Sequence, residues 1–239
     1  PVIVPKEFDI AGRTVIITGA ARGIGAGIVK VLAQAEARVL VTALTERYLR
    51  PLGEELNSAG HDVETLVADA TSADDWRRTI DTAFSRWGRV DALVNNLGDA
   101  IRGNLVPLTA SGDDAPLSEE EWQRVVDINL THAFLGCRAI GPHFIERRKG
   151  KVINISGIAA RRGSPGMLAY SVAKAGLVRF TQTLAQEWAP FGITVNSIGP
   201  GYFPDPDHGD PEQISRAREE ARSSVPLGRV GHPIEVGFL

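Results

Sequence analysis

Short apolar runs separated by longer amphipathic stretches set the pattern of this chain. The runs are rich in β-branched residues and alternate little between apolar and polar positions, which is typical of strands that are covered on both faces. The stretches between them have helical periodicity. We therefore expect strands near residues 15–17, 39–41, 66–68, 92–94, 152–155 and 193–195, and helices near residues 24–34, 46–59, 73–87, 118–147 and 167–188.

This alternation predicts an α/β fold, a doubly wound parallel sheet built from right-handed βαβ units with helices on both faces. No repeat or linker divides the chain, so we expect one domain over residues 1–239. Segments 99–117 and 199–227 interrupt the pattern after strands and should overhang the carboxyl edge of the sheet, where ligands bind in such folds. Segment 199–227, with a short helix near 212–222, fits a variable surface loop or a substrate lid equally well.

Composition narrows the class of protein. The net charge is −3, so no basic field indicates a nucleic acid or membrane partner. One cysteine, Cys137, excludes an internal disulfide, and no apolar run has membrane-spanning length, so we expect a cytoplasmic protein. His208 with Asp205, Asp207 and Asp210 could be read as a metal site. Acidic loops usually stay solvated, and we expect no metal.

A glycine-rich loop follows the first expected strand and opens the first expected helix. Residues 18–25 read Thr-Gly-Ala-Ala-Arg-Gly-Ile-Gly. Glycine permits a tight turn and a close approach of the backbone, and a helix N-terminus presents free N–H groups to a phosphate. In this context the loop predicts a binding site for a dinucleotide pyrophosphate.

Tyr170 and Lys174 lie four residues apart in an expected helix, which places them on one face. A phenol with an ordinary pKa of about 10 needs a drop of roughly 3 units to exchange a proton near neutrality, or about 4 kcal/mol. A cation at about 4 Å, with an effective dielectric constant near 20, supplies that much. The pair therefore predicts a proton-transfer centre in which Lys174 lowers the pKa of Tyr170.

Five motifs in this order resemble the short-chain dehydrogenase/reductase family, with its Rossmann-type sheet. They are Gly-x-x-x-Gly-x-Gly from Gly19, Asn95-Asn96-Leu97-Gly98, Asn129 within Asp-Ile-Asn-Leu, Tyr170-x-x-x-Lys174 and Pro200-Gly201. The resemblance runs over residues 8–239 and implies a nicotinamide cofactor. By position, the residues it implies for cofactor binding are Gly19, Arg22, Gly23, Ile24, Gly25, Thr42, Asp69, Ala70, Asn96, Tyr170, Lys174, Pro200, Gly201 and Phe203.

The end of the second strand bears on the choice between NADP and NAD. An acidic residue there would bind the ribose 2′-hydroxyl and repel a 2′-phosphate. This chain has no carboxylate before Glu46, whereas Arg22 could pair with a phosphate and Thr42, Thr45 and Arg47 are further candidate donors. We expect NADP in preference to NAD.

The resemblance also implies the chemistry. Tyr170 exchanges a proton with the substrate oxygen, Lys174 binds the ribose hydroxyls, and Asn129 holds a water that links Lys174 to solvent. The family's serine, thirteen residues before the tyrosine, is replaced by Gly157. Loss of one such donor costs about 100- to 1,000-fold in turnover. Ser156 could replace it if the backbone turns at Gly157, and Ser164 is a weaker candidate.

We therefore expect an NAD(P)-dependent oxidoreductase that transfers a hydride between nicotinamide and a carbonyl or secondary alcohol, such as a 3-oxoacyl compound or a small ketone. The alternative is a cofactor-binding protein with little or no catalysis. Arg161 and Arg162 could attract an anionic acyl carrier, although solvated surface arginines are more common. The resemblance implies a homotetramer or homodimer, and the chain stops at Leu239, before the family's last strand.

Overall fold

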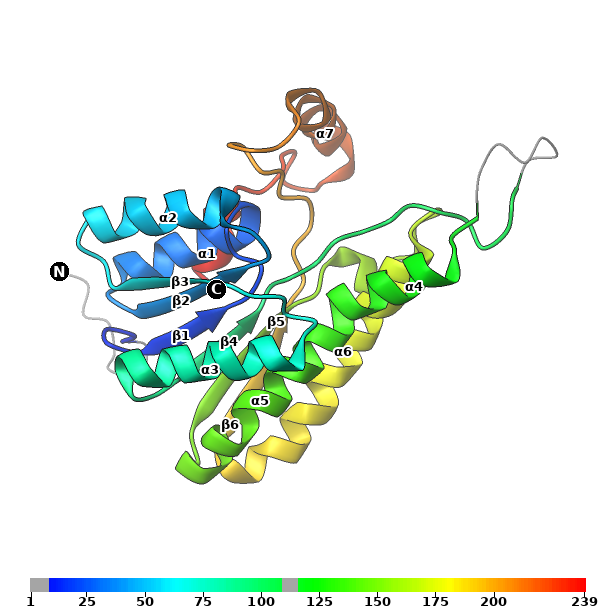
Figure 1. Cartoon of the computed structure of the whole chain (residues 1–239). Coiled ribbons are helices and arrows are strands. Elements are labelled where there is room, and N and C mark those ends of the chain that lie inside the picture. Colours follow the sequence, from blue (N-terminus) through cyan, green and yellow to red (C-terminus); the bar gives the residue numbers. More distant parts are fainter. Residues whose placement is uncertain (1–8, 109–115) are drawn as a thin grey trace.

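Six parallel strands form one sheet, with the order β3-β2-β1-β4-β5-β6. The computed structural model describes residues 9–108 and 116–239 (Figure 1). Strands β2 and β3 follow on one side of β1, and strands β4, β5 and β6 follow on the other side. The strand order therefore reverses between β1 and β4, and ligands bind at this switch point in folds of this class. The predicted α/β fold is confirmed. The strands are β1 Thr14–Ile17, β2 Arg38–Ala43, β3 Val63–Val67, β4 Ala92–Asn95, β5 Gly150–Ile155 and β6 Ile193–Ile198.

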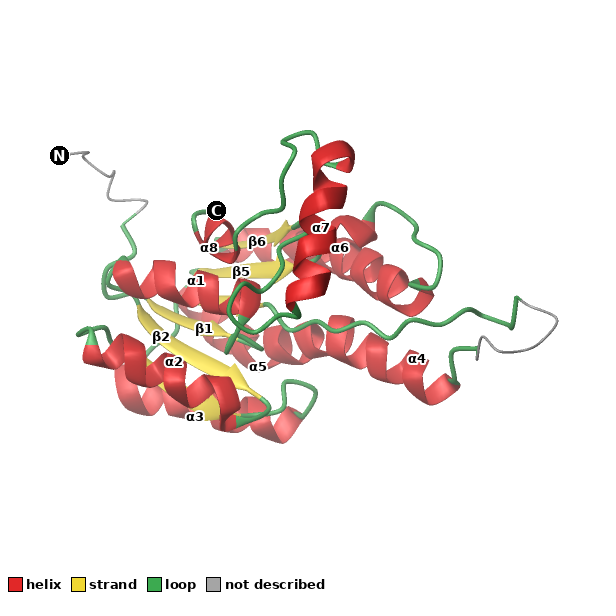
Figure 2. Ribbon diagram, turned by 90° about the horizontal axis from the view of Figure 1, so that it is seen from above, coloured by secondary structure: helices red, strands yellow, loops and turns green. Residues whose placement is uncertain are grey.

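Helices cover both faces of the sheet (Figures 1 and 2). One face carries α1 Gly23–Gln34, α2 Glu46–Ser58 and α8 Pro233–Gly237, and the other carries α3 Ala73–Trp87, α5 His132–Arg147 and α6 Leu168–Trp188. Ile17 packs in the core under α1 and α2, whereas its neighbour Ile16 packs in the core under α3 and α5. Because successive strand residues are buried on opposite faces, the strands have continuous apolar sequences.

The helix expected over 118–147 is interrupted. It divides into α4 Glu119–Val126, the π-helical turn η2 Asp127–Thr131 and α5. The N-terminus is capped reciprocally, with Ser118 Oγ accepting from the Glu121 backbone at 3.1 Å and Glu121 accepting from the Ser118 backbone at 2.9 Å. The turn η2 contains Asn129, one of the residues predicted for the site, and π-helical turns are frequent at functional sites.

The two predicted interruptions lie at the carboxyl edge of the sheet. Residues 99–108 run outward beside α4 and are tied to the start of α6 by the Gly103 N–H, which donates to Gly166 O at 3.0 Å. Residues 109–115 of this expected loop lie outside the described part of the chain. In segment 199–227, helix α7 Pro211–Ser224 stands beyond the carboxyl ends of the strands (Figure 2). The predicted overhang is confirmed for the described residues.

Candidate active site

Two positions of the glycine loop, Gly19 and Gly25, have no room for a side chain. Gly19 has φ +59°, and a β-carbon added to it would lie 2.9 Å from the side chain of Leu97. A β-carbon on Gly25 would lie 2.6 Å from the amide nitrogen of Asn96. That same nitrogen donates to the carbonyl of Thr18 at 3.1 Å and to that of Gly19 at 3.0 Å. Asn96 therefore braces the loop against β4.

Most of the residues predicted for the site meet in one cavity of about 470 Å³. It lies at the carboxyl edge, between the glycine loop, the ends of β4 and β5, the N-terminal part of α6 and the start of segment 199–227. Residues from distant parts of the sequence are thus brought together as expected. Those of the prediction that line it are Gly19, Arg22, Gly23, Ile24, Gly25, Asn96, Ser156, Tyr170, Lys174, Pro200, Gly201 and Phe203.

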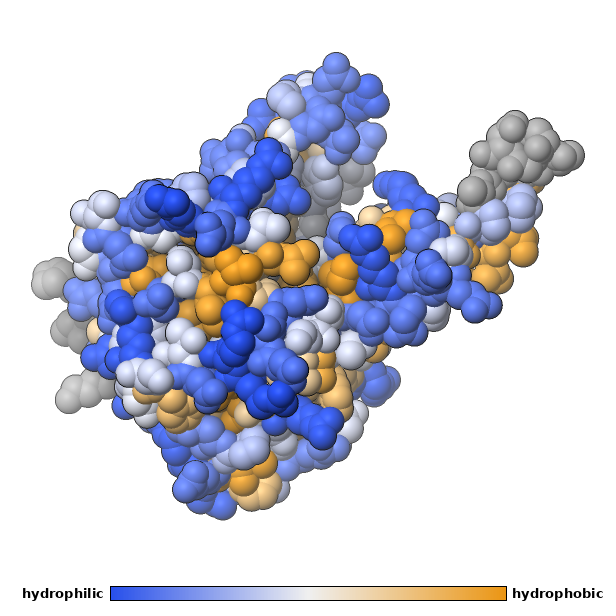
Figure 3. Space-filling view, in the orientation of Figure 1, coloured by the Kyte–Doolittle hydropathy of each residue, from blue (hydrophilic) through white to orange (hydrophobic). Residues whose placement is uncertain are grey.

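A second cavity, of about 580 Å³, adjoins the first at Gly19 and Leu97. It lies at the ends of β2 and β3 and reaches η2. Its walls are largely apolar, and Figure 3 shows apolar residues gathered between α2 and α3 and continuing toward α4. A flat heterocycle such as adenine suits a cavity of this kind. The lining includes Ala43, Leu44, Ala68, Asp69, Ala70, Leu97 and Ile128.

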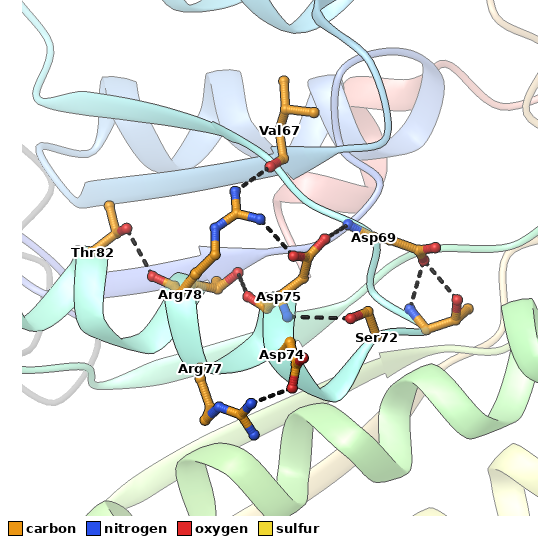
Figure 4. Close-up of polar contacts among 10 residues, drawn as sticks. Val67, Asp69, Ser72, Asp74, Asp75, Arg77, Arg78 and Thr82 are labelled. Carbon is orange, nitrogen blue, oxygen red and sulfur yellow. Dashed lines mark hydrogen bonds and ion pairs between the residues drawn. The ribbon is translucent and has the colours of Figure 1, made fainter.

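The turn that carries Asp69 is held by polar contacts (Figure 4). The Asp69 N–H donates to Asp75 at 2.7 Å, and its Oδ1 accepts from the backbone and the hydroxyl of Thr71 at 2.8 and 2.7 Å. Arg78 donates to the carbonyl of Val67 at 3.0 Å. Asp69 and Ala70 therefore line the second cavity, and the Asp69 carboxylate fixes the turn.

Thr42 does not have the predicted role. It lies inside β2, is 2% exposed and lines neither of these two cavities, because strand alternation turns its side chain into the core. The next two residues, Ala43 and Leu44, face the second cavity instead. Arg22 and Thr45 are exposed at this edge.

Lys174 is buried beneath the floor of the first cavity. It is 2% exposed, and its Nζ donates to the carbonyl of Ile155 at 3.0 Å and lies 5.7 Å from the centre of the Tyr170 ring. Burial disfavours the charged amine and lowers the pKa of Lys174 to about 8. The amine is thus positioned by the end of β5 and not by the phenol.

The expectation that Lys174 lowers the pKa of Tyr170 is wrong for this arrangement. The pKa of Tyr170 is raised, first because burial disfavours the phenolate and second because the Asp99 carboxylate lies nearby. The Lys174 amine donates to Ile155 and lies 5.7 Å from the centre of the Tyr170 ring, and it is not among the causes that shift the pKa of Tyr170. The phenol is held in its protonated form.

Asn129 is fully buried beside Lys174. Its amide nitrogen donates to the carbonyl of Asp99 at 2.6 Å and to that of Val125 at 2.8 Å. Its Oδ1 has no hydrogen-bond partner among the described residues. A β-carbon on Gly98 would lie 3.0 Å from both this oxygen and Lys174 Nζ. An unsatisfied buried acceptor next to an amine fits a polar ligand such as an ordered water.

The backbone turns at Gly157, with φ +135°, and the Ser156 hydroxyl is directed at β6. The Ser156 hydroxyl donates to the carbonyl of Ile198 at 3.0 Å and accepts from the Ser197 hydroxyl at 2.8 Å. Its proton is therefore already used. In this arrangement the Ser156 hydroxyl has no proton free for the role of the missing donor, and Ser164 is exposed and does not line the cavity.

Three residues near the site were not predicted. Asp99 and Asp205 line the first cavity, and His132 is fully buried at the start of α5. Burial and the charge of Lys174 lower the pKa of His132 to about 3. Asp99 directly follows the Asn-Asn-Leu-Gly motif, which was a usable signal. The positions of Asp205 and His132 depend on tertiary packing, which no local pattern reveals.

These residues fit a nicotinamide dinucleotide. The glycine loop supplies N–H groups and close approach for phosphates, the apolar cavity adjoins it, and the buried acceptor of Asn129 lies beside Lys174 at the other end. In residues 9–108 and 116–239 we find no cluster of side chains suited to a metal ion, and no helix with the length and apolarity needed to span a membrane.

Comparison with known proteins agrees with this geometry. A family model described as short chain dehydrogenase matches residues 13–211. The 3-oxoacyl-[acyl-carrier-protein] reductase of Thermotoga maritima is 33% identical over 228 residues, which cover 95% of this chain and 88% of the relative. The enzyme of the same name from Chlamydia pneumoniae is 33% identical over 232 residues, 96% of this chain and 88% of the relative.

Solved structures give the same result. A putative short-chain alcohol dehydrogenase from Sinorhizobium meliloti has a TM-score of 0.84 and 30% identity, and the match covers 96% of this chain and 88% of the other. An actinorhodin polyketide ketoreductase with NADPH has a TM-score of 0.82 and 31% identity over 95% of this chain and 88% of the other.

Proposed function

Because this chain belongs to the short-chain dehydrogenase/reductase family of NAD(P)-dependent oxidoreductases acting on CH–OH groups, we propose that it reduces a 3-oxoacyl compound or a small ketone, with NADPH as the preferred hydride donor. The observation that carries the proposal is the single cavity shared by the glycine loop, Tyr170 and Lys174. The names of the relatives support the 3-oxoacyl and ketone substrate class.

Tyr170 acts in this proposal as the proton donor. Its raised pKa keeps the phenol protonated at neutral pH, which suits transfer of a proton to a developing alkoxide. Lys174, with a pKa of about 8, is largely protonated there and donates to ribose hydroxyls. The cofactor, when bound, supplies the hydride. Gly19, Gly23 and Gly25 would hold its phosphates, and Asp69 and Ala70 would border its adenine.

The preference for NADPH rests on the edge of β2. Leu44 stands there, 69% exposed, with no carboxylate that would repel a 2′-phosphate. Arg22, at the start of α1, is exposed and makes no ion pair among the described residues, so its guanidinium is available to a phosphate.

A second candidate function is favoured by Gly157. With glycine there and the Ser156 proton used by Ile198, no hydroxyl of either residue faces the substrate oxygen. A protein that binds the cofactor but has little turnover could lack this hydroxyl donor in the same way. We propose reduction as the principal function because Tyr170 and Lys174 line one cavity and the Asn129 side chain lies beside Lys174.

We also propose that the chain forms a homodimer or homotetramer. Phe134 on α5 and Val172 on α6 are 45% and 47% exposed, which leaves large apolar side chains on neighbouring helices at the surface. Sedimentation at several concentrations tests this assignment, and a monomer at micromolar concentration would contradict it.

The test of the function is a titration with NADPH and NADH followed by turnover on a panel of carbonyl compounds that includes 3-oxoacyl thioesters. We expect tighter binding of NADPH and oxidation of NADPH with at least one carbonyl compound. Cofactor binding with no turnover on any compound would favour the second candidate. Failure to bind either cofactor would contradict both.

A further inference from the structure

The Asp205 carboxylate points one oxygen without a partner at the glycine loop. Its Oδ1 accepts from the N–H groups of Asp207 and His208, each at 3.1 Å, and so holds the turn after β6. Its Oδ2 is buried and has no hydrogen-bond partner among the described residues. A β-carbon added to Gly23 would lie 3.8 Å from Oδ2. The carboxylate is therefore fixed by its own turn and directed at the start of α1.

This position coincides with the expected site of the phosphates. Gly23 is the first residue of α1, where free N–H groups and the helix dipole favour anions. The cavity that contains the glycine loop also contains Asp205 and Tyr170. If the cofactor lies along this cavity, as the proposed function requires, its pyrophosphate approaches the free oxygen of Asp205.

No cationic side chain pairs with that oxygen in the described structure. Arg22 lines the same cavity but forms no ion pair with Asp205. His208 lies 3.5 Å from the other oxygen, Oδ1, and its ring stacks on Tyr48 at 4.3 Å.

Other charged groups around this region are committed elsewhere. Lys30 on α1 pairs with Glu55 on α2 at 2.9 Å. Lys174 donates to Ile155, and Asp99, which lines the same cavity, adds a further negative charge. A dinucleotide therefore meets a carboxylate whose Oδ2 is paired with no cationic side chain of the described structure.

We propose that Asp205 is a negative determinant of cofactor affinity, a residue whose carboxylate repels the cofactor pyrophosphate and keeps dinucleotide binding weak. The inference rests on the proposed function and adds a specific residue to it. Like charges in a partly dry cavity are screened much less than on an open surface. The consequence is faster release of the dinucleotide, because affinity differences within one site arise mainly from dissociation rates.

Asp205→Asn tests the proposal with little change of shape. The amide oxygen still accepts from Asp207 and His208, while the amide nitrogen replaces the free oxygen with a donor. The control is Asp207→Asn, which also removes one negative charge from this turn. Asp207 is exposed and does not line the first cavity. Asp205→Ser is a second variant, and thermal unfolding confirms that each variant is folded.

The ligands are NADPH and ADP-ribose, which has the pyrophosphate but no nicotinamide, and their dissociation constants are measured by calorimetry. We expect Asp205→Asn to bind both about tenfold more tightly than the unchanged protein, equivalent to about 1.4 kcal/mol. Asp207→Asn should bind both ligands with dissociation constants within about twofold of those of the unchanged protein, because its carboxylate is exposed and screened by solvent.

Two results would overturn the proposal and leave the proposed function intact. The first is equal or weaker binding of ADP-ribose by both Asp205 variants. The second is a loss of NADPH affinity with ADP-ribose unchanged, which would make Asp205 an acceptor for the nicotinamide amide. If the unchanged protein and all variants bind neither ligand, the proposed function fails together with the role of Asp205.

Discussion

The α-carbon of Gly157 faces the hydroxyl of Tyr170, so that a β-carbon built on Gly157 would lie 3.7 Å from the phenol oxygen. This is ordinary van der Waals contact, and a serine hydroxyl there would reach the place where a substrate oxygen meets Tyr170. The backbone of Gly157 has φ +135°, however, which L-residues rarely adopt. The missing side chain and the unusual backbone thus occur at the same residue.

Gly157→Ser should raise turnover relative to Gly157→Ala by about 100-fold or more, because it restores a hydrogen-bond donor. The alanine variant is the matched control, since both substitutions carry the same backbone strain, of order 1–3 kcal/mol. Turnover on the best substrate and denaturant unfolding of both variants are the measurements. Equal turnover of the two variants would show that a donor at this position is not what limits catalysis.

Asp99→Asn should lower the pKa of Tyr170, because the Asp99 charge is one of the two causes that raise it. In the direction of reduction the phenol must be protonated, so activity falls as the pH rises through its pKa. The variant should therefore lose activity at lower pH than the unchanged protein, most clearly at low salt. Asp81→Asn, an exposed position on α3, controls for the change in net charge. If activity declined at the same high pH in the variant and in the unchanged protein, the Asp99 charge would not raise the pKa of Tyr170.

The fold and the membership of the cavity were predictable, because they depend on patterns local in sequence. Continuous apolar strands, the glycine loop between strand and helix, and the spacing of Tyr170 and Lys174 each have a direct structural meaning. The side-chain partners were not predictable. Lys174 donates to Ile155, and Ser156 to Ile198, because main-chain carbonyls at the ends of β5 and β6 are the nearest acceptors.

The interruption of the helix before α5 shows the same limit. Val126 and His132, which flank the turn, have ordinary α-helical dihedral angles, and the sequence predicts a continuous helix over the π-helical turn. A π-helical turn differs from an α-helix in its backbone hydrogen bonds, which join residues five apart instead of four, and the pattern of apolar residues does not reveal this difference. Thr42 was wrongly predicted for a related reason, since a strand alternates sides and its neighbours face the cavity instead.

Lys174→Met should stabilise the protein at neutral pH. The pKa of Lys174 falls from 10.5 to about 8 on burial, which corresponds to a cost of about 3 kcal/mol while the amine is charged in the folded state. Below pH 8 this cost is fully present, and it disappears as the pH rises toward 10.5, because the unfolded state binds more protons over that range. The advantage of the variant in urea unfolding should be largest at pH 7 and shrink above pH 8. A variant that is less stable at every pH would contradict this.

His132→Leu should make the protein more resistant to acid. Burial and Lys174 lower the pKa of His132 from 6.5 to about 3, so the unfolded state takes up a proton below pH 6.5 that the folded state refuses. Stability is therefore lost as the pH falls from 6.5 toward 3. Between pH 7 and pH 5 the free energy of unfolding should fall by about 2 kcal/mol more for the unchanged protein than for the variant. Equal losses in urea unfolding at the two pH values would exclude His132 as a source of acid sensitivity.

The most direct test of the account is the rate of NADPH oxidation by Tyr170→Phe with the best carbonyl substrate, at a saturating cofactor concentration. The substitution removes one oxygen and leaves the glycine loop and Lys174 in place, so cofactor affinity should change little. We expect turnover to fall by about 100- to 10,000-fold, the usual contribution of general acid catalysis. Turnover within a few-fold of the unchanged protein would contradict the assignment of Tyr170 as the proton donor.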